Sequence, residues 1–191
     1  DQGATWDAKE TIVDTFFRGI VIDPDAPLPA GVVASHRTGD INAEVAVDRT
    51  TGVVYLVWQD SRFGPRSSIA FSQSLDGGLT WSTPIKVNQT PDLPNNLNEQ
   101  AFTPMVQVLD DGTVGVSYYD AHCHAASEDC SVAGSWDDEV PVTDAPFDSR
   151  KAPVARGFFL GDYVGLGQSG TAFFPFFTVT TGSTGIYAEP S

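Results

Sequence analysis

The chain has 191 residues, of which 25 are Asp or Glu and 10 are Lys or Arg, so its formal net charge at pH 7 is -15. A net negative field repels phosphate, which argues against nucleic acid and anionic membranes as partners. No apolar run approaches the roughly 20 residues that a membrane span requires. Two interpretations of the charge stay open: carboxylates that keep the surface soluble, or carboxylates that bind Ca²⁺ through their oxygen atoms.

Short β-rich runs alternate with segments of Gly, Pro, Asp, Asn, Ser and Thr, and helical periodicity is nearly absent. This pattern predicts an all-β meander. Turns that contain Asp, Gly or Ser are expected at 48–52, 110–112 and 168–170. The expected strands are Glu44–Asp48, Val53–Gln59, Ser68–Ser74, Ile85–Asn88, Met105–Leu109, Val114–Asp120, Tyr163–Gln168 and Thr171–Thr180.

Three stretches of the chain repeat one plan: a strand, a turn, a long apolar and aromatic strand, and a polar exit. They start at Ala43, Thr103 and Gly161, and this interval of about 60 residues is somewhat longer than the period of common propeller blades. The first repeat continues into a third and a fourth strand. It therefore predicts a complete four-stranded blade, with extended loops between one repeat and the next.

The octapeptide SLDGGLTW lies between the third and fourth strands of the first repeat. Ser74 and Asp76 can fix a tight turn by hydrogen bonds to nearby backbone, and Gly78 permits positive φ there. Thr80 and Trp81 begin the next strand, with the indole as an apolar anchor. The string resembles the Asp-box, or BNR repeat, of sialidase-type β-propellers, and the role expected for these five residues is structural.

Four further stretches resemble secreted bacterial proteins of the sialidase-like BNR-repeat family, often labelled exo-α-sialidase: VYLVWQDSR, SQSLDGGLTWSTPIKV, QAFTPMVQVLDDGTVGVSYYD and KAPVARGFFLGDYVGL. The resemblance extends from about Ala43 to Tyr187 and implies a sialidase-type propeller, which has six blades. The chain would hold about three four-stranded blades of it, in a single partial domain over 1–191: blade remnants in 1–42, then blades 43–100, 101–156 and 157–191.

Two broken copies of the Asp-box, Asp1–Trp6 and Ser131–Trp136, mark the phase of the blades. They indicate that the chain enters in the middle of one blade. Three blade equivalents would leave open sheet edges, so we expect a second chain or missing blades to close the propeller.

The family resemblance implies an extracellular glycoside hydrolase that acts on a glycan substrate. A sialidase needs Arg residues for the substrate carboxylate, a Tyr paired with a Glu as nucleophile, and an Asp for acid–base chemistry. Glu44 and Glu99 are the best-placed partners for a Tyr. The Arg-Ile-Pro motif of sialidases is absent from the sequence. The alternative is a non-catalytic propeller that binds glycan or protein. Neither function requires a cofactor, and Ca²⁺ binding is left open.

The polar exits of the first two repeats supply candidate site residues. WQDSR places Asp60 and Arg62 past a strand, either as a local pair that fixes a loop or as substrate-binding groups. SYYDAH places Tyr119 and Asp120 at the matching position, and we expect them to be catalytic. Alternation sends Tyr118 and Tyr119 to opposite faces, so only one of them can point into a site while the other packs.

The third repeat begins after RGFFLGDYVGL, where two glycines bracket Asp162 and Tyr163. The glycines predict a close backbone approach near the propeller axis, and we expect Asp162 and Tyr163 to be catalytic. The alternative is that Asp162 caps a turn and Tyr163 fills space between blades. Arg37 and Arg156 flank strand ends and join Arg62 as substrate-binding candidates.

Cys123 and Cys130 are the two cysteines, and His122 and His124 lie beside the first of them. A disulfide across the loop would suit an exported protein. Free thiols and a metal site are the alternatives, although the spacing matches no familiar zinc pattern. We therefore predict a disulfide and no transition-metal site.

Overall fold

The structure is a computed structural model, and it describes residues 36–37, 42–64, 67–89, 101–120, 139–140, 142–143, 147, 151–155, 157–180 and 184–188. Within these ranges the chain forms strands and turns and no α-helix, so the described part of the fold is all-β. This confirms the all-β class expected from the sequence, whereas the propeller arrangement stays a prediction.

The first repeat forms a four-stranded antiparallel sheet in the order β2-β3-β4-β5. Val54 pairs with Ser74 at one end of β3, and Asp60 pairs with Ser68 at the other. The four strands expected from the sequence are present in the expected order, although β5 has only two residues. Their bounds are β2 Glu44–Val47, β3 Val54–Asp60, β4 Ser68–Ser74 and β5 Ile85–Lys86.

The second repeat forms a two-stranded antiparallel sheet, and the third forms a three-stranded sheet in the order β11-β10-β9. A short parallel pair, β1 with β8, joins segments that are far apart in the sequence. The strands are β1 His36–Arg37, β6 Ala101–Val108, β7 Val114–Asp120, β8 Phe158–Phe159, β9 Gly165–Ser169, β10 Ala172–Thr180 and β11 Thr184–Ala188. β6 begins at Ala101 rather than at the expected Met105.

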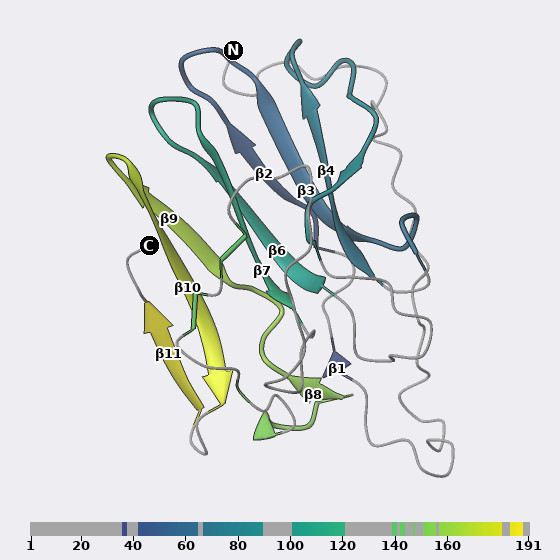
Figure 1. The fold of residues 1–191 in the computed structure, drawn as a ribbon, viewed down its shortest axis with the longest axis vertical. Coiled ribbons are helices and arrows are strands. Elements are labelled where there is room, and N and C mark those ends of the chain that lie inside the picture. The colour runs from purple at the N-terminus through teal and green to yellow at the C-terminus, as the bar shows by residue number, and fades with distance from the viewer. Residues whose placement is uncertain are drawn as a thin grey trace, which may run out of the picture.

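The three sheets lie in a row in chain order, with the turns β2–β3, β6–β7 and β9–β10 at the same end (Figure 1). Strands β2, β3 and β4 contact β6, and β6 contacts β9. The β1–β8 pair lies toward the strand ends opposite these turns (Figure 1). The sheets therefore pack face to face, and the end that lacks the turns gathers the polar exits of the repeats.

Two apolar clusters hold the sheets together. The first lies between the β2–β5 sheet and the β6–β7 hairpin and includes Val57 and Ile69, which are fully buried. The second joins Phe102 and Tyr119 of the hairpin to Leu160 and to Phe177 of β10. Alternation along β7 divides its side chains between the two clusters, because neighbouring residues of a strand point to opposite faces.

Gly115 on β7 lies directly against the Phe173 ring of β10. A Cβ atom at Gly115 would come within 2.6 Å of Cζ of Phe173, which is closer than real Cβ contacts come. The second and third sheets can therefore approach as they do only because this position has no side chain.

We expect Gly115→Ala to destabilise the fold by about 1–3 kcal/mol, because the added methyl group overpacks the contact with Phe173. Gly167→Ala is the matched control, since a Cβ there would make only ordinary contacts, the nearest at 3.6 Å. Urea unfolding of the two variants measures the difference. Equal stability of Gly115→Ala and the wild type would contradict the packing described here.

Candidate functional site

The polar exits of the repeats lie at the strand ends opposite the hairpin turns. This side of the three sheets is here called the exit end. Asp60 ends β3, Asp120 ends β7, and Glu44 begins β2 at this end. Arg37 of β1 and Asp162, which follows β8, are joined there by an ion pair. Burial raises the pKa of Glu44 above its ordinary value.

The Asp-box lies at the other end of the first sheet. Ser74 pairs with Val54, while Asp60 lies six residues further along β3, a distance of about 20 Å at the usual rise of a strand. The Asp-box is therefore remote from the exit end, where the other candidate residues lie.

Within the Asp-box, the Asp76 carboxylate organises the turn. It accepts hydrogen bonds from the Ser74 hydroxyl at 2.8 Å, and from the Thr80 backbone N–H at 2.8 Å and hydroxyl at 2.6 Å. Ser74 Oγ accepts from the Gly78 N–H at 2.7 Å, and the Trp81 indole donates to the Gly78 carbonyl at 3.2 Å. Gly78 has a φ of 98°, which a residue with a Cβ rarely adopts.

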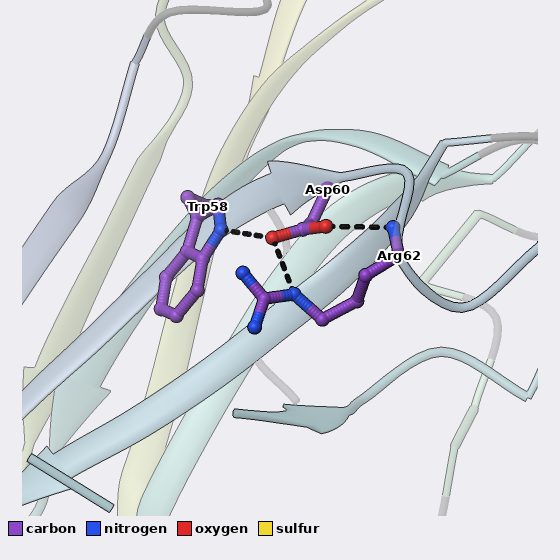
Figure 2. Close-up of polar contacts among 3 residues, drawn as sticks. All are labelled: Trp58, Asp60 and Arg62. Atoms are coloured by element: carbon purple, nitrogen blue, oxygen red, sulfur yellow. Dashed lines mark hydrogen bonds and ion pairs between the residues drawn. The ribbon is translucent and has the colours of Figure 1, made fainter. Parts of the chain in front are cut away.

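Asp60 and Arg62 form a local pair at the end of β3 (Figure 2). The Asp60 carboxylate is 1 % exposed and accepts from the Trp58 indole at 2.7 Å, and from the backbone N–H of Arg62 at 2.7 Å and its Nε at 2.9 Å. The Arg62 guanidinium also lies 5.9 Å from the centre of the Trp58 ring, a cation–π contact. These contacts fix the loop that follows β3.

Arg37 and Asp162 form a second pair, between β1 and the segment before β9. Arg37 Nη2 lies 2.7 Å from Asp162 Oδ2, and the guanidinium lies 4.4 Å from the centre of the Phe159 ring. The Asn42 side chain donates to the Asp162 backbone carbonyl at 2.7 Å. Tyr163, next to Asp162, is 75 % exposed. The group ties the parallel β1–β8 pair to the start of the third sheet.

Tyr119 points into the second apolar cluster, and its ring packs on Phe102 and Phe147. Its hydroxyl donates to the Thr178 carbonyl of β10 at 3.0 Å and accepts from the Thr178 N–H at 2.8 Å. Burial raises its pKa. Both hydrogen-bonding functions of the Tyr119 hydroxyl are thus used in joining β7 to β10.

Tyr118 points the other way, toward the first sheet, and its hydroxyl donates to Oε1 of Glu139. The second oxygen of Glu139 accepts from the backbone N–H of Gln89 at 2.9 Å. Burial, together with the hydrogen bond and charge of Glu139 and the charge of Asp120, raises the pKa of Tyr118 far above its ordinary value. The structure therefore contains a Tyr–Glu pair, with Asp120 close enough to affect its electrostatics.

The candidate site residues predicted from the sequence have different surroundings in the structure. Arg37 is paired with Asp162, and Asp60 with Arg62, whereas Tyr119 is packed in the core. Several candidates lie outside the described residues: Arg156, Cys123, Cys130, His122, His124, Glu99 and the Asp-box copies at 1–6 and 131–136.

Two broader features apply to the described ranges only. No group of three or more His, Cys, Asp or Glu side chains there is arranged to hold a metal ion. Among the same residues, no helix is long and apolar enough to cross a membrane. The expectation of Ca²⁺ therefore stays a prediction.

Sequence reasoning missed Glu139 and did not choose Tyr118. Because neighbouring residues of a strand point to opposite faces, the sequence limited the tyrosine that could point into a site to Tyr118 or Tyr119. Glu139 is 21 residues beyond Tyr118 and belongs to no recognisable motif, so no sequence signal marked it. No protein-family model, no curated protein and no solved structure matches the chain.

We expect the contribution of Asp76 to stability to depend on pH. Its hydrogen bonds lower its pKa from 3.8 to about 2, so its stabilising effect is fully present above about pH 4 and is lost as the pH falls toward 2. Asp76→Asn removes this titration, so urea midpoints of the variant and the wild type should differ most at pH 7 and converge near pH 2. Asp110→Asn, an exposed Asp of another turn, is the control. A difference that stays constant across this range would contradict the assignment.

Proposed function

We propose that the chain is part of a sialidase-type β-propeller that hydrolyses glycosides at its exit end. The observation that supports this most is the hydrogen bond between Tyr118 and Glu139. A Tyr activated by a Glu is the nucleophile that sialidases use in place of a carboxylate. In this proposal Tyr118, rather than Tyr119, is the nucleophile, because the Tyr119 hydroxyl is already bonded to Thr178.

The chemistry follows from the environment of Tyr118. Because the pKa of this phenol is raised, it stays protonated at neutral pH and needs a base when it attacks. Glu139 takes the proton as the phenolic oxygen bonds to the anomeric carbon and the aglycone departs with its electron pair. Asp120, two residues after Tyr118 on β7, is the candidate acid that protonates the leaving oxygen. Water then cleaves the glycosyl–Tyr118 bond and gives a proton to the Asp120 carboxylate, while Glu139 returns its proton to the phenol oxygen.

Arg37 is the better candidate for contact with an anionic substrate. Its side chain is 37 % exposed, whereas that of Arg62 is 20 % exposed and lies against Trp58. A substrate carboxylate would have to share or replace the Asp162 interaction. Asp162 and Tyr163 would then line the same region, with the exposed Tyr163 ring available to stack on a sugar.

A second function, a non-catalytic propeller that binds glycan or protein, is favoured by the aspartate partners of the two arginines. Both guanidinium groups are engaged within the chain. If this is the function, Glu139 serves only to connect Gln89, after β5, to Tyr118 of β7. Turnover distinguishes the two functions, because a structural link between sheets requires none.

Hydrolysis of a fluorogenic sialoside tests the enzyme proposal. We expect Tyr118→Phe to reduce turnover to background, and Glu139→Gln to lower it by about 10²–10⁴-fold, the usual contribution of a general base. Tyr55→Phe is the matched control and should leave turnover unchanged, because Tyr55 pairs with Gln73 near the Asp-box end of the sheet. Absence of turnover by the wild-type assembly, or full activity of Tyr118→Phe, would reject the enzyme.

We also propose that further sheets, from a second chain or from missing blades, complete the propeller. The outer face of the first sheet exposes Val45 and Val47, and the outer face of the third exposes Phe176. Exposed apolar side chains on the outer faces of both the first and the third sheet are expected if further sheets pack against each of them.

Light scattering during size-exclusion chromatography checks this closure. We expect a mass above that of one chain, or loss of solubility when the chain is alone, because the outer faces of the first and third sheets expose apolar side chains. Val45→Lys combined with Val47→Lys should shift the assembly toward smaller species, whereas Leu75→Lys, an exposed change in the Asp-box, should not. A wild-type chain that is a stable and soluble monomer would contradict the proposal.

A further inference from the structure

The pairing of β6 with β7 is interrupted by a bulge at one place. Ala101 pairs with Asp120 and Phe102 with Tyr119, but the next pair is Met105 with Ser117. Two residues of β6, Thr103 and Pro104, therefore lie opposite a single residue of β7. That single residue is Tyr118.

The register on either side of the bulge does not require the extra residue. A regular strand with one residue opposite Tyr118 would leave Phe102 paired with Tyr119 and Met105 with Ser117, each on its present face. The two apolar clusters would also keep their members, because Phe102 contributes to one and Val106 to the other. The extra residue is therefore not explained by the packing of the sheets.

The bulge is also unfavourable where it stands. Thr103 has a φ of 52°, in the left-handed region, and is the only residue other than glycine with positive φ among those that the structure describes. A β-branched side chain is strained there, and Thr103 is only 3 % exposed. Pro104, which is also buried, lacks the N–H that a strand would use in its ladder. Backbone strain of this kind concentrates at functional sites.

The side chains of β7 alternate between the two clusters, and the residue that faces the bulge, Tyr118, is the one that extends beyond the first cluster. Val114 and Val116 pack on the first cluster, and the Tyr118 hydroxyl continues from that side to Glu139. Tyr119, one residue later, reaches Thr178 of β10 with its hydroxyl. A bulge bends its strand and increases the local twist, which re-aims the side chains beside it.

We propose that the Thr103–Pro104 bulge is a positioning element that directs the Tyr118 phenol to Glu139. The importance of the bulge for catalysis rests on the proposed role of Tyr118 as nucleophile. Its effect on the direction of the Tyr118 side chain can be measured without turnover. In this scheme Thr103 and Pro104 act through the direction of Tyr118.

Deleting Pro104 tests the proposal, because it leaves Thr103 alone opposite Tyr118 and preserves every other pair. We expect the deletion variant to fold with a thermal midpoint equal to or above that of the wild type, since the strain is removed. The NMR signals of the Tyr118 hydroxyl proton and ring carbon Cζ, assigned by their loss in Tyr118→Phe, should move to those of a phenol not bound to Glu139. Sialoside turnover should fall by about 100-fold, as for a displacement of about 1 Å at a reacting group.

Thr103→Gly is the matched control, because glycine keeps the bulge and adopts its φ without strain. It should keep both the Tyr118 signals and the turnover. A second deletion variant, in which Val replaces Thr103 and Pro104 is removed, favours the regular strand further.

The outcomes separate this proposal from the enzyme proposal. Tyr118 signals that are unchanged in a folded deletion variant would overturn the positioning role, whatever the turnover. Failure of both deletion variants to fold would also overturn it, because the bulge would then be required by the sheet itself. A wild-type chain without turnover would reject the enzyme, while the Tyr118 signals would still decide whether the bulge positions the phenol.

Discussion

Face-to-face packing of successive sheets is the constraint on which the rest of this structure depends. Each hairpin must bury one face against the sheet before it, and the second hairpin must bury both. Alternation then leaves little choice for the side chains of β7: Tyr118 follows Val114 and Val116 toward the first sheet, and Tyr119 turns toward the third. The Tyr–Glu pair therefore arises on the side of the hairpin that the hydrophobic pattern assigns to Tyr118. Gly115 serves the same packing from the opposite face, where Phe173 occupies the space of a side chain.

The acidic composition also gains a structural explanation. Asp48 accepts from the backbone N–H groups of Thr50 and Thr51 in the first hairpin turn, and Asp111 accepts from Thr113 in the second. The hydrogen bond from Thr51 is the largest cause of the lowered pKa of Asp48, and the hydrogen bond from Thr113 is the largest cause for Asp111. Hydrogen bonds from Thr80 and Ser74 lower the pKa of Asp76 in the same way. An Asp followed within a few residues by a Thr thus recurs as the element that closes turns. Some of the negative charge belongs to the folding of the hairpins rather than to solubility or to Ca²⁺.

Local patterns of the sequence predicted most of the described strands and all three turns, because alternation and turn residues act over a few positions. The Asp-box is of this kind: each of its hydrogen bonds joins residues no more than four apart. What the sequence could not provide depends on long-range contacts. The β1–β8 pair joins two strands of two residues each, too short to show any periodicity, and the Arg37–Asp162 ion pair spans 125 positions. The bulge at Thr103 could not be predicted for another reason. A Thr–Pro dipeptide within an apolar run indicates that strand pairing is interrupted, but not which residue of the neighbouring strand lies opposite.

If the proposed function is correct, the charges of the described residues at the exit end limit how an anionic substrate would bind. A chain with a net charge of -15 repels an anionic sugar at long range, so the attraction must come from contacts within a few ångströms. Among the described residues of the exit end, the guanidinium groups of Arg37 and Arg62 already have carboxylate partners, of which Asp60 is buried and Asp162 is partly exposed. Separating Arg62 from Asp60 would leave a buried charge without its partner, which is costly, whereas Asp162 can return to water when Arg37 changes partner. Under the proposed function, the partly exposed Arg37–Asp162 pair is therefore the one that a substrate carboxylate would open, while the Trp58–Asp60–Arg62 group would stay fixed.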